Sequence, residues 1–103
     1  MSTRSTVGIK SGNGFTAIYI HYDGYPEHML ANLPNNMSDI SDMISQGSGS
    51  ALEDGVVVKN VDDYEGPKEY HSKFNWLDSM KQRWCDWYYL WDEENEKWEY
   101  GKL

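Results

Sequence analysis

Apolar and polar residues alternate at the start of the chain, which is the pattern of a β-strand with one buried face. Residues 4–10 show this alternation, and residues 15–22 are rich in β-branched and aromatic side chains. Between these two runs, Ser-Gly-Asn-Gly at residues 11–14 is a dense turn signal. The pattern predicts a β-hairpin, which ends before Pro26 because proline lacks an amide donor.

Helical periodicity follows the hairpin. Pro26 can occupy the first turn of a short helix, which Pro34 then ends. Apolar residues spaced i, i+3 and i+4 predict a second helix, with Ser38 as its cap and Gly47 as its stop. The segment that follows, residues 46–50, has the Gly/Ser composition of a flexible linker.

The second half of the chain adds a strand, a helix and an aromatic hairpin. Residues 56–61 predict a short strand, and residues 76–83 a helix. Residues 84–91 read as a strand with rings on both faces, and residues 97–100 as its return arm. We therefore expect a single α+β domain over residues 1–103. Its antiparallel sheet would contain both hairpins and the middle strand, with two or three short helices on one face.

The chain is acidic, with a formal net charge of −8, and its second half carries most of that charge. It has no basic stripe to bind phosphates, so direct nucleic-acid binding is not expected. An acidic surface suits a basic protein partner or a mimic of nucleic acid, although the charge could also serve solubility alone. No apolar run is long enough to span a membrane, and the first residues lack a signal-peptide pattern, so a cytoplasmic setting is expected.

Aromatic residues are the most unusual part of the composition, with five Trp, eight Tyr and two Phe. Many of these rings fall within residues 76–100, more than the core of a small domain needs. Exposed rings beside carboxylates are typical of protein interfaces, while the simpler alternative places the same rings in the core. The candidate partner-binding residues are Trp87, Tyr89, Trp91 and Trp98 as anchors, with Asp92, Glu93, Glu94 and Glu96 steering a basic partner.

Two blocks near the N-terminus carry a resemblance. They read Ser-Thr-Arg-Ser-Thr-Val-Gly-Ile at residues 2–9 and Ala-Ile-Tyr-Ile-His-Tyr-Asp-Gly-Tyr-Pro-Glu at residues 17–27. Over roughly residues 1–33 the chain resembles a family of small, uncharacterised bacteriophage and prophage proteins, and residues 21–27 are the most specific part. The resemblance implies a phage accessory protein that acts in host takeover or in blocking immunity, and it supplies no catalytic residue.

From these observations we expect a non-enzymatic protein that binds and inhibits or redirects a host protein, without a cofactor. A homodimer is also plausible, because strand edges and rings favour self-association. One alternative is a sponge that sequesters a small nucleotide signal by stacking its base on rings. The candidate residues for this nucleotide site are Arg4, His21, Tyr25, Lys81 and Arg83.

A second alternative is a small metal-dependent hydrolase. His21, Asp23 and His28 are close in sequence and have the side chains of metal ligands, and the distant His71 could complete the set. The simpler explanation is that Asp23 stabilises the turn at the end of the strand. Cys85 is the only cysteine, which excludes an internal disulfide. Its neighbours Trp84 and Asp86 should raise the pKa of the thiol, so we do not expect a nucleophile there.

Overall fold

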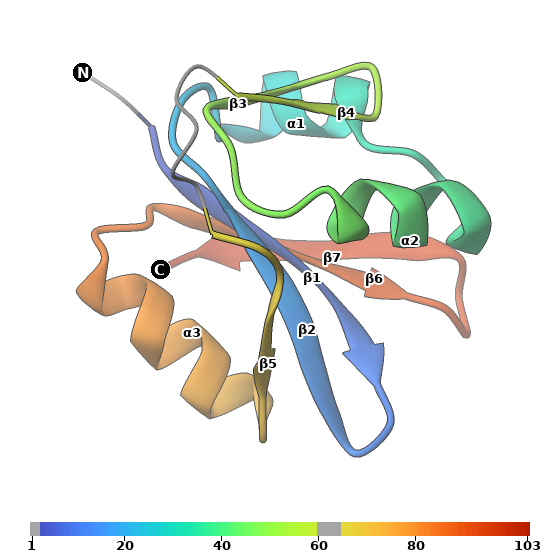
Figure 1. The fold of residues 1–103 in the computed structure, drawn as a ribbon, viewed down its shortest axis with the longest axis vertical. Helices are drawn as coiled ribbons and strands as arrows, with labels where there is room; N and C mark the ends of the chain where they lie inside the picture. Colours follow the sequence, from blue (N-terminus) through green and yellow to red (C-terminus); the bar gives the residue numbers. More distant parts are fainter. Residues whose placement is uncertain (1–2, 60–64) are drawn as a thin grey trace.

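The computed structural model describes residues 3–59 and 65–103, which form a five-stranded sheet, a separate two-stranded sheet and three helices (Figure 1). The strand order of the larger sheet is β5-β2-β1-β6-β7. The α+β class, the N-terminal hairpin and the C-terminal hairpin are confirmed. The elements are β1 (Ser5–Ser11), β2 (Gly14–Ile20), α1 (Pro26–Asn32), α2 (Met37–Ser45), β3 (Ala51–Glu53), β4 (Val56–Val58), β5 (Lys68–Tyr70), α3 (Lys73–Gln82), β6 (Trp87–Asp92) and β7 (Lys97–Lys102).

The larger sheet is mixed, so the prediction of a wholly antiparallel sheet is wrong. β1 and β6 pair in parallel, whereas β1–β2, β2–β5 and β6–β7 pair antiparallel. The reason is the path of the chain after β5. Because β5 is antiparallel to β2, it runs in the direction of β1, and α3 then carries the chain back before β6 begins. This β5-α3-β6 crossover makes β6 parallel to β1.

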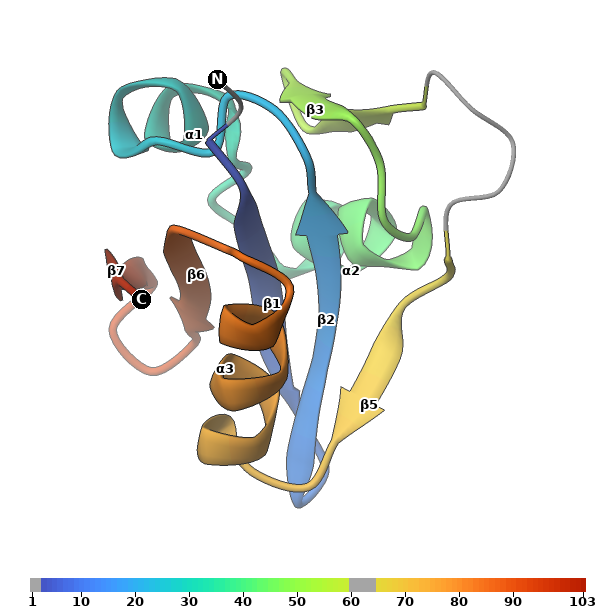
Figure 2. The ribbon, with the colours of Figure 1, turned by 90° about the vertical axis from the view of Figure 1, so that its left-hand side faces the viewer.

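Helices cover both faces of this sheet, and the expectation of helices on one face is therefore also wrong. Figure 2 shows α3 on one side, with α1 and α2 on the other. Each face has its own apolar core, one packed against Ile40, Met43 and Ile44 of α2 and the other against Trp76 and Met80 of α3. The central strand β2 explains this arrangement, because four consecutive residues at its end are buried, and such a strand needs a cover on each face.

The middle of the chain differs most from prediction. Val56–Val58 is β4, which pairs with β3 in the small sheet and not in the large one, and residues 60–61 of the predicted strand lie outside the described residues. Residues 46–50 are not an extended flexible linker. The Ser48 hydroxyl accepts a hydrogen bond from the amide of Tyr19 at 2.9 Å, and the residues that follow lie against the end of β2.

Of the three helices described, only α1 begins at the predicted residue. α1 begins at Pro26, as predicted. The cap of α2 is Asn36, two residues before the predicted Ser38, and its side chain accepts a hydrogen bond from the amide of Asp39 at 2.9 Å. α3 begins earlier than predicted because Ser72 caps it.

In the part of the chain that the structure describes, no helix has the length and apolar character needed to cross a membrane.

A buried hydrogen-bond chain fixes α3 to the sheet. The Trp76 indole donates from Nε1 to Oγ1 of Thr6 at 2.9 Å, and the Thr6 hydroxyl donates to the carbonyl oxygen of Ile18 at 2.8 Å. Gly8 lies beneath the indole, and a Cβ there would come within 2.8 Å of the ring. The glycine therefore lets Trp76 approach β1 closely enough to make this contact.

Candidate functional site

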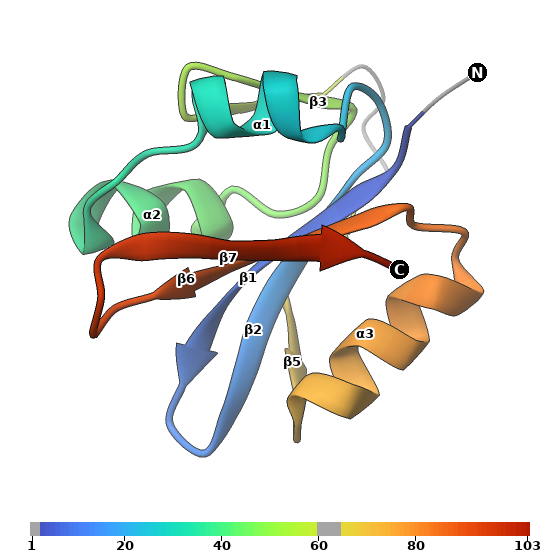
Figure 3. The same ribbon diagram turned by 180° about the vertical axis from the view of Figure 1, so that it is seen from behind.

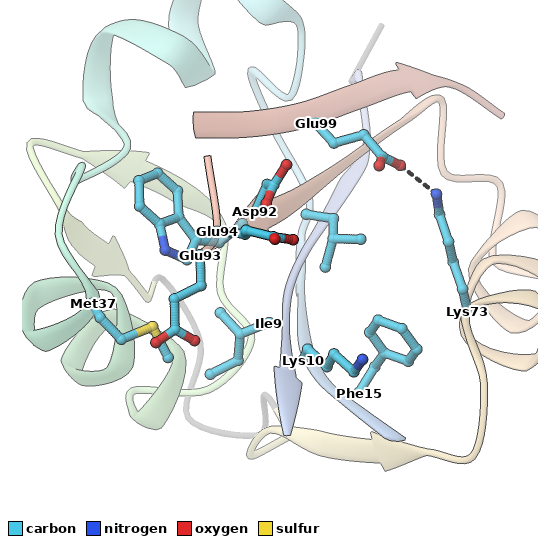
Figure 4. A pocket seen from close by; sticks show the side chains of 11 residues that line it. Ile9, Lys10, Phe15, Met37, Lys73, Asp92, Glu93, Glu94 and Glu99 are labelled. Atoms are coloured by element: carbon cyan, nitrogen blue, oxygen red, sulfur yellow. Dashed lines mark hydrogen bonds and ion pairs between the residues drawn. The ribbon is translucent and has the colours of Figure 1, made fainter. Parts of the chain in front are cut away.

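The two hairpins of the large sheet separate at one end and enclose a cleft (Figure 4). The parallel pairing of β1 with β6 stops at Gly8 and Leu90, although β1 continues to Ser11 and β6 to Asp92. The cleft between the diverging ends has a volume of about 610 Å³. It therefore lies at the carboxyl ends of two parallel strands, a position where open sheets often bind ligands.

The inner surface of the cleft is largely apolar. Ile9 and Phe15 come from the β1–β2 hairpin, Met37 from the start of α2, and Leu90 and Trp91 from β6. Four of these side chains are partly exposed, whereas Trp91 is only 5% exposed. Phe15 is held in place by stacking on Trp76, with the ring centroids 5.9 Å apart. This surface gives an incoming side chain an apolar area to bury.

The rim of the cleft is acidic. Asp92 ends β6, and Glu93 and Glu94 follow it in the β6–β7 turn. Lys10 is the cation of the cleft that forms no ion pair among the described residues. A second cation, Lys73, also lines the cleft, but it forms an ion pair with Glu99. The carboxylates of the turn therefore outnumber the cation that is free to balance them.

Glu99 is already engaged inside the protein. Its carboxylate receives a hydrogen bond and the ion pair from Lys73, and the hydroxyl of Tyr88 donates to its Oε2 at 2.8 Å. The hydrogen bond from Lys73 is the main cause that lowers the pKa of Glu99, and the same bond raises the pKa of Lys73. Glu99 therefore ties β7 to α3 and contributes little free charge to the cleft.

Asp92 shapes the turn. Its carboxylate accepts hydrogen bonds from the backbone amide of Asn95 at 3.1 Å and from the side-chain amide of the same residue at 2.7 Å. These bonds lower the pKa of Asp92, so the group stays ionised. Glu96 follows in the left-handed region with φ +52°, which turns the chain into β7. The exposed carboxylates Glu93 and Glu94 are thus presented on a fixed turn.

The structure places the predicted ring anchors in the core more than on the surface. Tyr89 and Trp91 are buried, and the hydroxyl of Tyr89 donates to the carbonyl oxygen of Gly24 at 2.7 Å. Trp98 is half-buried, and its Nε1 donates to the carbonyl oxygen of Pro34 at 2.9 Å. The expectation that these rings lie exposed is therefore wrong for Tyr89 and Trp91, because the sheet is covered on both faces.

Trp87, the remaining predicted anchor, is also half-buried. It packs against the core on the α1/α2 side of the sheet, and the Nζ of Lys102 lies 5.7 Å from the centre of its ring. Glu96, the last of the predicted steering residues, is exposed at the β6–β7 turn. Only part of the Trp87 ring is therefore accessible. Among the predicted partner-binding residues, the glutamates of the β6–β7 turn are the exposed ones.

Sequence reasoning missed two strongly exposed rings. Phe74 is 75% exposed and Trp84 is 77% exposed. The helix predicted over residues 76–83 contains neither ring, whereas α3 begins at Lys73 and faces the sheet with Trp76 and Met80. Arg83 is the C-cap of α3, so Trp84 lies just beyond the helix, in the left-handed region with φ +66°.

Part of the candidate nucleotide site comes together at the other end of the sheet. The guanidinium of Arg83 lies 4.4 Å from the centre of the Tyr19 ring, and Nη1 of Arg4 donates to the carbonyl oxygen of Arg83 at 3.3 Å. The hydroxyl of Tyr19 is 2.8 Å from Nδ1 of His21. Arg83 also forms an ion pair with Glu65 at 3.7 Å, which offsets part of the positive charge.

The other two predicted nucleotide-binding residues have different surroundings. Tyr25 contacts His28, with ring centroids 6.1 Å apart, and Lys81 lies on the outer face of α3. His28 in turn binds the carbonyl oxygen of Leu52 through Nε2 at 2.7 Å. Within residues 3–59 and 65–103, no three potential metal ligands gather, so the His21, Asp23 and His28 set is not assembled.

Cys85 has the environment of a structural thiol. It is buried in the core beside α3, and this burial is the main cause that raises the pKa of its thiol to about 12. Asp86 raises the pKa further, while Arg83 and Arg4 lower it. The prediction of a raised pKa is confirmed, and the thiolate needed for nucleophilic attack is scarce at neutral pH.

Comparison of the chain with models of known protein families, with curated proteins and with solved structures finds no match.

Proposed function

We propose that this protein is a non-enzymatic binding protein, and that the cleft between its two hairpins docks a basic, partly apolar segment of another protein. The observation that carries the proposal is an apolar cleft wall beside an acidic rim. On this rim Glu93 and Glu94 are exposed, and no cation among the described residues forms an ion pair with them. Neither feature alone specifies a partner, but together they match one kind of side chain.

Lysine and arginine have that chemistry. Their aliphatic stems can lie along Ile9, Phe15 and Leu90, while their charged ends reach the carboxylates of the rim. The rim charges would also speed the encounter with a basic partner, and added salt would screen this effect. The rigid turn around Asp92 favours binding further, because little side-chain and backbone freedom remains to be lost there.

We further infer that the partner is a host protein and that the setting is the host cytoplasm. The support for this part is the resemblance of residues 1–33 to small phage proteins. Binding would inhibit the partner or redirect it. Cys85, which is buried at the α3 side, is not among the residues that line the cleft.

The test is affinity capture from bacterial lysate, with three forms of the protein as bait. The cleft variant is Glu93→Lys with Glu94→Lys. The matched control is Glu53→Lys with Asp54→Lys, which changes the net charge equally at the exposed β3–β4 turn. We expect the wild type and the control to retain one basic partner at low salt and to release it at high salt, while the cleft variant loses it. Equal retention by the cleft variant would refute the proposal.

The nucleotide sponge is a second candidate. It is supported by Arg83 over the Tyr19 ring, by His21 at the Tyr19 hydroxyl, and by Arg4, which donates to the carbonyl oxygen of Arg83. A nucleotide phosphate could bind the two guanidinium groups, and a base could stack on exposed Trp84. Thermal-shift screening with cyclic and adenine nucleotides tests this candidate, because a tight ligand raises the melting temperature. A rise that Arg4→Gln abolishes would favour the sponge over the cleft proposal.

A further inference from the structure

Strand β7 forms an open edge of the larger sheet, and we propose that it pairs with β7 of a second copy of this chain to form a two-fold homodimer. Among the described strands, β7 pairs with β6 alone. In Figure 3 it runs across the front of the molecule, and no other described element passes over it. This inference does not depend on the partner proposed for the cleft.

Three residues of β7 direct their backbone amide and carbonyl groups away from β6. In an antiparallel pair, residues that bond to the neighbouring strand alternate with residues that point away from it. The amide of Leu103, just after β7, donates to the carbonyl oxygen of Asp86 at 2.9 Å, so every second residue counted back from Leu103 faces β6. The outward residues are Trp98, Tyr100 and Lys102. Within the described chain, their outward backbone groups have no hydrogen-bond partner.

β7 lacks most of the features that protect a sheet edge. Natural edge strands are often kept very short, or carry a proline or a bulge. The opposite edge follows this rule, because β5 has only three residues. β7 has six residues, no proline and an unbroken register with β6. Lysine can also protect an edge, but the Nζ of Lys102 lies 5.7 Å from the centre of the Trp87 ring, over the face of the sheet.

One antiparallel register uses all three outward residues. When Tyr100 pairs with Tyr100 of the second copy, Trp98 of each strand pairs with Lys102 of the other, and every one of these pairs can exchange two backbone hydrogen bonds. Centring the pairing on Glu99 or on Gly101 leaves one outward residue of each strand without a partner in the other strand. The tyrosine-centred register is therefore the one that satisfies the edge most completely.

The side chains also match in this register. The outward residues all lie on the α1/α2 face of the sheet, where the exposed Tyr100 ring stacks on Tyr89. Pairing sets the two Tyr100 rings side by side and brings the ammonium of Lys102 to the indole of Trp98, a favourable cation–π pair. On the other face, Glu99 lies opposite Gly101, so no like charges meet across the interface.

Salt distinguishes this dimer from binding at the cleft. Two copies of a chain with net charge −8 repel each other, and dissolved ions screen that repulsion. Dimerisation should therefore strengthen as salt is added, whereas the binding of a basic segment at the cleft should weaken. Failure of one proposal thus leaves the other testable.

The first experiment follows the wild type by sedimentation equilibrium from about 1 µM to about 1 mM, at low and at moderate salt. We expect monomer to convert to dimer with a dissociation constant of about 10–100 µM at moderate salt. Amide hydrogen exchange over the same range should show new protection at Trp98, Tyr100 and Lys102, and none at the β5 edge. A monomer at every concentration would overturn the proposal, as would new protection confined to another surface.

Variants at the two-fold axis then locate the interface. Tyr100→Lys sets two ammonium groups against each other and should weaken the dimer by about tenfold or more. The matched control is Tyr22→Lys, because Tyr22 is equally exposed, at 46%, and follows β2 rather than lying in β7. This control should dimerise as the wild type does. Equal dimerisation by Tyr100→Lys would overturn the proposal.

Cross-linking tests the register itself. In the tyrosine-centred pairing the two Cα atoms at position 100 lie about 5.5 Å apart, which a disulfide can span. Tyr100→Cys should therefore give a disulfide-linked dimer under mild oxidation, while Tyr22→Cys should stay monomeric on a denaturing gel. The native Cys85 is buried and does not compete. Cross-linking no faster at position 100 than at position 22 would contradict the proposed pairing.

Discussion

Substitution of Thr6 tests whether the buried chain from Trp76 through Thr6 to Ile18 fixes α3 to the sheet. Thr6→Val keeps the size of the side chain but removes the hydroxyl. The Nε1 donor of Trp76 then loses its acceptor at 2.9 Å, and the carbonyl oxygen of Ile18 loses a donor at 2.8 Å. Both Trp76 and Thr6 are fully buried, so water does not replace the lost bonds without a rearrangement.

The expected cost comes mainly from the indole of Trp76, because the carbonyl oxygen of Ile18 still faces Val7 in the β1–β2 ladder. A buried polar group left without a partner costs about 1–3 kcal/mol, so Thr6→Val should lower the free energy of unfolding by about that amount. Thr6→Ser is the matched control, because it keeps the hydroxyl and removes only a methyl group. Its cost should be about 1 kcal/mol. For a domain whose total stability is of the order of 5–15 kcal/mol, the difference between the two variants is easily measured.

Urea unfolding at equilibrium, followed by tryptophan fluorescence, measures both variants against the wild type. The slope of the free energy against urea concentration should stay the same in all three, which shows that the folded and unfolded states remain comparable. If Thr6→Val is as stable as Thr6→Ser or more so, the buried hydrogen bonds do not hold α3 in place, and this part of the account is refuted.

Three further predictions concern single sites. Gly24→Ala should destabilise the fold by about 1–3 kcal/mol in the same urea assay, because its Cβ would lie 2.7 Å from the Cβ of Ser5; wild-type stability would contradict the close contact. Cys85, whose pKa is raised to about 12 by burial, should resist iodoacetamide in the folded protein at pH 8 and react in urea; fast labelling of folded protein would contradict its burial. Burial is the main cause that lowers the pKa of His21, and the charge of Arg4 lowers it further. An NMR titration should therefore give His21 a pKa below 6.5, and Arg4→Gln should raise that pKa part of the way back. Because the unfolded state then binds the proton more tightly, the contribution of His21 to stability falls as pH drops through its ordinary pKa.

Local patterns were enough to predict the two hairpins and the start of α1. Alternation, the Gly-Asn-Gly turn and the proline at Pro26 are signals within a few residues of the elements they specify. The Asp54-Gly55 pair was a signal of the same kind that sequence reasoning did not use. Both residues have positive φ, +50° and +76°, as a tight hairpin turn requires, and they join β3 to β4.

The pairing of strands and the covered faces depend on contacts far apart in sequence. The parallel pairing of β1 with β6 follows from β5 and α3, and the short β5 had no pattern of its own. One clue that helices cover both faces of the sheet was present in β2. Ala17–Ile20 does not alternate between apolar and polar residues, because both faces of the strand are buried there. The rings on both faces of β6 have the same explanation, and they are not by themselves a sign of an exposed interface.

The candidate cleft could be predicted only in part. Asp92, Glu93 and Glu94 were predicted, because they form a run of carboxylates in a turn. The apolar wall was not, since Ile9 and Phe15 meet this turn only through the divergence of two hairpins. The exposure of Phe74 was also missed, because helical spacing does not show which of two overlapping apolar stripes faces the sheet.

The most direct measurement of the central claim is an NMR titration of the labelled protein with a short capped peptide of alternating lysine and leucine. The account predicts amide shifts centred on Ile9, Glu93 and Glu94 that weaken as salt is added. It also predicts that the shifts disappear in Glu93→Lys with Glu94→Lys and persist in the control with lysines at 53 and 54. Absence of shifts at the cleft, or shifts that survive the cleft variant, would contradict the account.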